Sequence, residues 1–177
     1  QPALGTTERL HLYGSTIAFQ WLMVAIVIWR AFSRELSLDE LGLTLADPLR
    51  TGLIAGALTL LLCVNQMVSL RMIARIPADK RGFLFRFTEM IMPRTPTETL
   101  AFMGLACTAG LSEEFLYRGF VFAVFARTFS DSANQVWIAA IVSSCWFAVG
   151  HLYQGRRGII TTFVVGMIFV SVRIWSR

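Results

Sequence analysis

The sequence predicts an all-α fold, a polytopic transmembrane helix bundle of about five spans plus one interfacial helix. Two observations support this fold. Of the 177 residues, 55% are hydrophobic and only 15% are charged, whereas a soluble domain of this length usually carries about 25% charged residues. Several apolar runs also approach the ~20 residues that a helix needs to cross a bilayer. The composition therefore favours a membrane protein.

Four apolar runs make up most of the predicted bundle. Each holds few charges, and basic residues cluster at the edges of the apolar runs, as around membrane crossings. They are residues 15–29, 51–70, 135–153 and 159–175. Residues 30–50 mix charges with leucines, so we expect them to connect the first two spans or to lie at the membrane surface. Residues 154–158, QGRRG, are expected to form a short basic loop.

The remaining helix is predicted over residues 97–129. Its apolar length exceeds one crossing, so it is either one long tilted helix or two helices that meet near Gly110 or Gly119. Before it, residues 81–93 alternate aromatic and charged side chains, which is typical of an amphipathic helix at the membrane interface.

Charge and cysteine content exclude several classes of protein. The formal net charge is +5, but the basic residues cluster at the edges of apolar runs, as in the loops of membrane proteins. A nucleic-acid partner is not expected, because that function needs a basic stripe on a folded surface. Cys63, Cys107 and Cys145 stand alone in apolar runs without CxxC spacing, so neither a zinc knuckle nor a disulfide framework is indicated.

Three charges, Glu113, Glu114 and Arg118, interrupt an otherwise apolar helix. Each costs about 2.5–3.5 kcal/mol at the bilayer centre, and the three together cost on the order of 8–10 kcal/mol if unpaired. Glu114 and Arg118 are four residues apart and can pair on one helical face. Glu113 points elsewhere and needs water or another helix, which suits a general base. Alternatively, all three charges only lock helices together.

A second pair of residues, Phe147 and His151, shares one helical face at the end of a later span. Taken alone, a histidine in this position is either an interfacial hydrogen-bonding residue or a functional group. The other histidine, His11, has no acidic partner close by in the sequence, and we assign it no role.

The motifs Glu-Glu-x-x-x-Arg and Phe-x-x-x-His, on successive membrane helices, resemble the CPBP family of intramembrane proteases. That family includes type II CAAX prenyl endopeptidases and bacteriocin-processing or Abi-like self-immunity proteins. The resemblance runs from about Pro93 to the end of the chain. It implies a protease core over residues 77–177, incomplete at its C-terminal end, preceded by N-terminal spans and a connecting segment over residues 1–76.

The resemblance also implies roles for five residues. Glu113 would activate a water for attack on a peptide carbonyl, while Glu114 and Arg118 would orient and support it. His151 would stabilise the oxyanion or share in proton transfer, and Phe147 would shape the cavity. The implied partners are the lipid bilayer and a peptide or protein with a C-terminal or membrane-proximal cleavage site. The implied location is a multi-pass position in a membrane, which we expect to be a bacterial inner membrane.

Family members carry a third motif, a further His followed by Asn or Asp on a later helix. Only two residues follow Trp175 here, so we expect the chain as given to be inactive and the complete protein to continue by at least one helix.

Members of the family are often described as metalloproteases, but these residues favour no metal. Catalytic zinc usually takes three protein ligands, and the sequence contains neither HExxH nor HxxEH. If a divalent metal such as zinc is bound, we expect Glu113 and His151 as ligands. Two other functions stay open: a non-catalytic membrane protein that binds a peptide or serves as an immunity factor or scaffold, and a transporter with an intramembrane ion pair.

Overall fold

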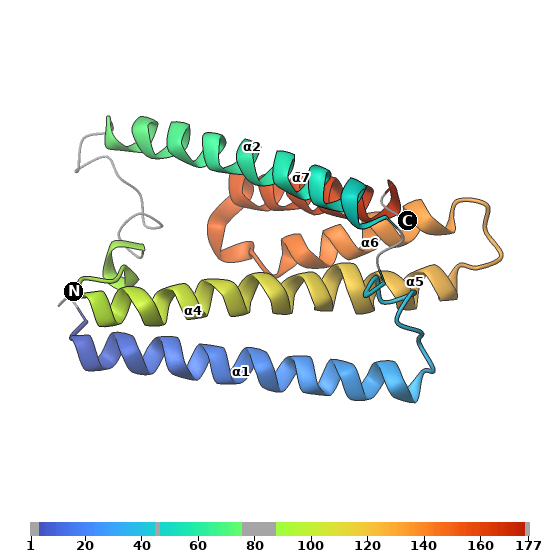
Figure 1. The fold of residues 1–177 in the computed structure, drawn as a ribbon, viewed down its shortest axis with the longest axis horizontal. Coiled ribbons are helices and arrows are strands. Elements are labelled where there is room, and N and C mark those ends of the chain that lie inside the picture. Colours follow the sequence, from blue (N-terminus) through green and yellow to red (C-terminus); the bar gives the residue numbers. More distant parts are fainter. Residues whose placement is uncertain (1–3, 45–46, 76–87, 176–177) are drawn as a thin grey trace.

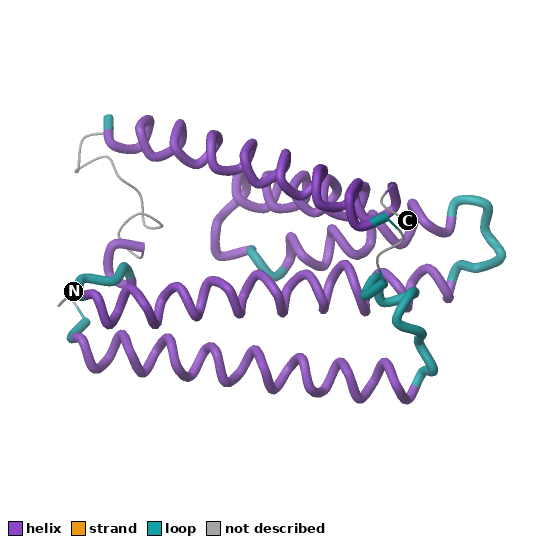
Figure 2. The backbone as a smooth tube through the Cα atoms, viewed as in Figure 1, coloured by secondary structure: helices purple, strands orange, loops and turns teal. Residues whose placement is uncertain are grey.

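The computed structural model describes residues 4–44, 47–75 and 88–175 and contains helices, loops and no strand within these ranges (Figures 1 and 2). The elements in chain order are α1 (Thr6–Ser33), α2 (Pro48–Ala74), α4 (Pro96–Glu113), η2 (Glu114–Val121), α5 (Phe122–Thr128), α6 (Gln135–Val149), η3 (Leu152–Gln154) and α7 (Gly155–Trp175). The predicted all-α helix bundle is confirmed.

Three of the described helical segments are long and apolar enough to cross a membrane. They are Thr6–Ser33, Pro48–Met72 and Leu152–Trp175. Gln135–Val149 is also apolar but is shorter than a full crossing. The chain is therefore an integral membrane protein, while the number of about five spans stays a prediction.

Helices α1 and α4 lie side by side and run in the same direction, because α2, which comes between them in the sequence, runs the opposite way on the far side of α4 (Figure 1). Their first turns are joined by a buried ion pair. Arg9 Nε donates to Glu98 Oε2 at 2.9 Å, and Arg9 Nη2 donates to Glu98 Oε1 at 3.0 Å. Helix α4 begins where the sequence favours it, with Thr95 as N-cap and Pro96 in the first turn. These contacts fix α1 against the helix that carries the acidic motif.

Helices α6 and α7 form an antiparallel pair that packs through small residues (Figure 1). Gly166 of α7 allows this approach, since a Cβ there would lie 3.1 Å from the Ser144 Cβ. Close packing through glycine, alanine and serine is the usual way in which membrane helices associate. Ala139, Ala140 and Val170 are fully buried and pack against Phe122 of α5. This contact ties the pair to the motif helix, the continuous run of α4, η2 and α5 that carries Glu113, Glu114 and Arg118.

The segment after α1 folds back onto the motif helix instead of leading straight into α2. Leu36 and Leu41 are buried against Ala123 of α5. Arg127 of α5 donates to both carboxylate oxygens of Glu40, at 2.6 and 2.9 Å. Hydrogen bonds from Arg127 and from Ser37 lower the pKa of the Glu40 carboxyl from 4.5 to about 2. This connecting segment therefore has a defined place against η2 and α5.

One prediction about the C-terminal region is wrong. Residues 155–158, expected to lie in a loop, belong to the first turn of α7. The chain reverses within residues 150–154, and Gly155, with φ of 73°, lets the next helix start at once. The predicted interfacial helix over residues 81–93 lies mostly outside the described residues, which resume at residue 88.

Candidate active site

The acidic motif lies within one uninterrupted helical run formed by α4, η2 and α5 (Figure 2). The sequence allowed either one long helix or two helices that meet near Gly110 or Gly119. The structure has one long helix, which does not break at either glycine. The middle of the run, Glu114–Val121, is π-helical. A π-helical turn within an α-helix is rare and is frequently found at functional sites. Here it begins directly after Glu113.

Side chains from other elements bond to carbonyls of the π-helical segment. Ser143 Oγ of α6 donates to the Tyr117 carbonyl at 2.6 Å, and Arg173 Nη1 of α7 donates to the Gly119 carbonyl at 3.4 Å. Gly119 also permits a close approach of the connecting segment, since a Cβ there would lie 3.2 Å from the Leu41 carbonyl oxygen. The segment is therefore held by contacts that are distant in sequence.

Arg118 is the buried cation of the site, with 5% of its surface exposed. Its guanidinium lies between two rings, 4.0 Å from the Phe147 centroid and 5.3 Å from the Phe169 centroid. Its Nη1 is 3.1 Å from Glu114 Oε1, so the predicted ion pair is present. The pair lacks hydrogen-bond geometry, and neither Nη1 nor Nη2 has a hydrogen-bond partner among the described residues. Charge and ring stacking hold the guanidinium here.

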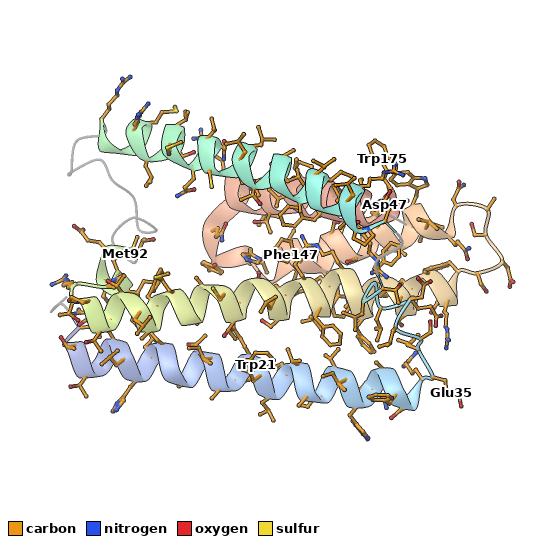
Figure 3. All side chains as sticks on the ribbon, in the orientation of Figure 1. Trp21, Glu35, Asp47, Met92, Phe147 and Trp175 are labelled. Carbon is orange, nitrogen blue, oxygen red and sulfur yellow. The ribbon has the colours of Figure 1, made fainter. Side chains whose placement is uncertain are left out.

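His151 lies just past the end of α6, in the turn that leads to α7. Its Nδ1 is 2.8 Å from the Phe147 carbonyl oxygen. A carbonyl can only accept, so Nδ1 carries the hydrogen, and Nε2 of the neutral ring keeps its lone pair. The ring packs edge-on against Phe147, with centroids 4.7 Å apart. Phe147, labelled in Figure 3, thus lies between Arg118 and His151.

Glu113 is the last residue of α4 and is partly buried. It lies about one π-helical turn before Arg118 in the same helical run. It also lines a cavity of about 240 Å³ between α1 and the start of η2. Tyr117 lines the same cavity and packs edge-on against Phe147 at 5.2 Å. The predicted residues of α4, η2 and α6 are therefore brought together at one place in the bundle.

This arrangement provides the groups needed to activate a water. A carboxylate and an imidazole nitrogen with a lone pair flank the Tyr117 and Phe147 rings, in a largely apolar surrounding where electrostatic interactions are strong. A fixed arginine beside them supplies positive charge. Ser143, Arg173 and Tyr117 were not predicted to take part. The adjacent serines in the apolar run of α6 and the charge near the end of α7 were the available signals.

The donor set does not match the usual requirements of catalytic zinc. Within residues 4–44, 47–75 and 88–175, no three His, Cys, Asp or Glu side chains come together as a metal site would require. Glu113 and His151 alone supply two of the three protein ligands usual for zinc. The three cysteines are free and exposed. We therefore derive no chemical step through a metal.

Residues 95–177 match the family model described as type II CAAX prenyl endopeptidase Rce1-like. The matched segment runs from the N-cap of α4 through α7 and includes all five residues of the two motifs, whereas α1 and α2 lie outside it. Neither the curated proteins nor the solved structures include a match to the chain.

Proposed function

Since residues 95–177 belong to the Rce1-like family of type II CAAX prenyl endopeptidases, we propose that this protein is an intramembrane endopeptidase that uses a water activated by Glu113. At family level the activity is that of a CAAX-type protease. The finer proposal concerns the mechanism and the part that each residue plays in it.

Glu113 acts as the general base. Its carboxylate removes a proton from a water, and the water oxygen forms a bond to the carbonyl carbon of the substrate peptide. The carbonyl π bond opens to an oxyanion. When the C–N bond breaks, the proton held by Glu113 passes to the leaving amine, so that atoms and charge balance.

His151 and Arg118 adjust the charge around this step. Because His151 Nδ1 donates to the Phe147 carbonyl, Nε2 is the ring nitrogen that is free to act on the water. In the neutral ring, Nε2 accepts a proton or a hydrogen bond from the water, and only the protonated ring donates to an oxyanion. Glu114 and the ring-stacked Arg118 form the supporting pair.

One observation carries the proposal: Glu113 and Tyr117 line one cavity, and Tyr117 and His151 pack against the same Phe147 ring, although Glu113 and His151 are 38 residues apart. A purely structural ion pair needs only Glu114 and Arg118, which lie on one helical segment. The additional acid and the imidazole beside it, next to a cavity, make a base and a second proton-transfer group, as amide hydrolysis requires.

The proposed substrate is a peptide or protein whose C-terminal or membrane-proximal cleavage site reaches the site within or beside the bilayer. The cavity that Glu113 lines is mostly apolar, with Phe115 and Val27 among its walls, and this suits a substrate with apolar side chains. We place the protein in a bacterial inner membrane as a multi-pass protein.

The test replaces Glu113 in the full-length protein with glutamine, which keeps the volume of the side chain and removes the base. C-terminal peptides of cells with the wild-type gene, the Glu113→Gln gene or no gene are compared by mass spectrometry. We expect processing to fall by about 10²–10⁴-fold in the variant. Glu89→Gln, an exposed carboxylate outside the site, serves as the matched control and should process normally.

Processing that continues in Glu113→Gln at an unchanged protein level would exclude Glu113 as the base. If no peptide depends on the gene at all, the non-catalytic alternative, a peptide-binding immunity factor or scaffold, becomes the better explanation.

A further inference from the structure

One polar side chain of α1 points into the same cavity as Glu113. Gln20 lies near the midpoint of Thr6–Ser33, a helix long and apolar enough to cross a membrane. It lines the cavity of about 240 Å³ together with Glu113 and Tyr117. A carboxamide in the middle of an apolar span is costly unless a hydrogen-bond partner is present.

The oxygen of this carboxamide is buried without a hydrogen-bond partner in the part of the chain that the structure describes. Buried polar atoms in native proteins are nearly always paired, and each exception asks for an explanation. The neighbouring side chains of α1 in the cavity, Met23, Val24 and Val27, are apolar. Gln20 therefore has its free hydrogen-bonding capacity directed at the cavity.

We propose that Gln20 is a substrate-binding residue, whose carboxamide pairs with the backbone of an extended peptide lying in the cavity beside Glu113. The inference rests on the proposed function. A primary carboxamide has both an acceptor and donors, as a peptide group has, so it can bind backbone independently of the substrate's sequence. The apolar walls then take aliphatic side chains that flank the scissile bond.

The contact comes from a region that the family match does not include, since α1 precedes residue 95. Helix α1 is nevertheless held in a fixed position against the motif helix by the Arg9–Glu98 ion pair. The carboxamide is thus presented from a rigid element across the cavity from Glu113, which is the arrangement that precise substrate positioning requires.

The experiment compares Gln20→Met with the wild type in the full-length protein reconstituted into liposomes. Methionine has nearly the same length and shape but cannot accept a strong hydrogen bond. The probe is an internally quenched peptide with aliphatic residues on both sides of its cleavage site. We expect KM to rise about tenfold, the loss of one buried hydrogen bond, with kcat changed less than about twofold and the thermal midpoint unchanged or higher.

Thr16→Val is the matched control, because Thr16 lies one turn earlier on α1 and its hydroxyl bonds to the Leu12 carbonyl instead of facing the cavity. Its KM should equal that of the wild type. An unchanged KM in Gln20→Met overturns the inference, and so does a loss of thermal stability without a change in KM, since that result assigns Gln20 to helix packing.

Two further measurements separate this inference from the proposed function. If Glu113→Gln abolishes cleavage but Gln20→Met leaves KM unchanged, the proposed function stands and the inference fails. If the wild type does not cleave, binding of the same peptide with a fluorescent label is measured. Binding about tenfold weaker in Gln20→Met supports the inference without the activity, and equal binding or none overturns it.

Discussion

The buried ion pair between Arg9 and Glu98 gives a quantitative test of how α1 is held against α4. Arg9 is 3% exposed and Glu98 is 0% exposed. Two N–H···O bonds join them at 2.9 and 3.0 Å, and the Arg94 backbone N–H adds a third bond to Glu98 at 2.7 Å. Replacing one partner by a residue of similar size leaves the other charge buried, at a cost of about 3–5 kcal/mol.

The double replacement should cost much less than the sum of the two single ones. Arg9→Met and Glu98→Met each leave an unpaired charge, whereas Arg9→Met/Glu98→Met leaves none. The double variant still deprives the Arg94 N–H of its acceptor, which costs about 1–3 kcal/mol. The sum of the two single losses should therefore exceed the double loss by about 3 kcal/mol or more.

The assay is thermal unfolding in detergent micelles, followed by tryptophan fluorescence. For a chain of this length, 1 kcal/mol corresponds to about 2–4 °C in the midpoint, so each single variant should lose roughly 10 °C. Arg30→Met, at an exposed arginine of the same helix, should change the midpoint by less than about 2 °C. Strictly additive losses in the double variant would refute the reasoning, because they would mean that the two charges do not depend on each other.

Three further predictions concern the charges and the metal question. Hydrogen bonds from Arg127 and Ser37 hold the pKa of Glu40 at about 2 instead of 4.5, so the stability that ionised Glu40 gives to the fold is present above pH 4.5 and is lost as the pH falls toward 2. The difference in thermal midpoint between wild type and Glu40→Gln should shrink from about pH 6 to about pH 3, and Glu89→Gln should show no such trend. For the site pair, Glu114→Gln/Arg118→Met should unfold at a higher temperature than Arg118→Met alone, because the single change leaves an orphan carboxylate. Peptide cleavage by the full-length protein should survive treatment with a zinc chelator; abolition by the chelator and rescue by added zinc would overturn the metal-free mechanism.

The parts of the site that were predictable depend on short separations along one chain segment. The contact between Glu114 and Arg118 follows from their spacing of four residues on a helix. The same spacing brings Phe147 and His151 together, although His151 lies past the end of α6 and not within it. Local geometry sets both contacts, so both can be predicted even when the ends of the helices are slightly misplaced.

The π-helical segment illustrates what the local sequence did not reveal. Its apolar and charged residues are as compatible with an α-helix as with a π-helix, and the segment is contacted by Ser143 and Arg173 from other helices. The first turn of α7 is a second case. Glycines and arginines suggested a loop there, but a helix begins at Gly155 once the chain has reversed.

By itself, the sequence determined that the chain is a helical membrane protein and which charges stand out in it, because bilayer length and the cost of buried charge act on each segment separately. Only the tertiary structure decided that Gln20 and Glu113 line one cavity, and that Tyr117 and His151 pack against the same Phe147 ring. These residues come from α1, from the run of α4 and η2, and from α6 and the turn after it, so their meeting depends on how α1 and α6 pack against that run. Packing of that kind arises from many weak contacts between distant residues, which no single segment encodes.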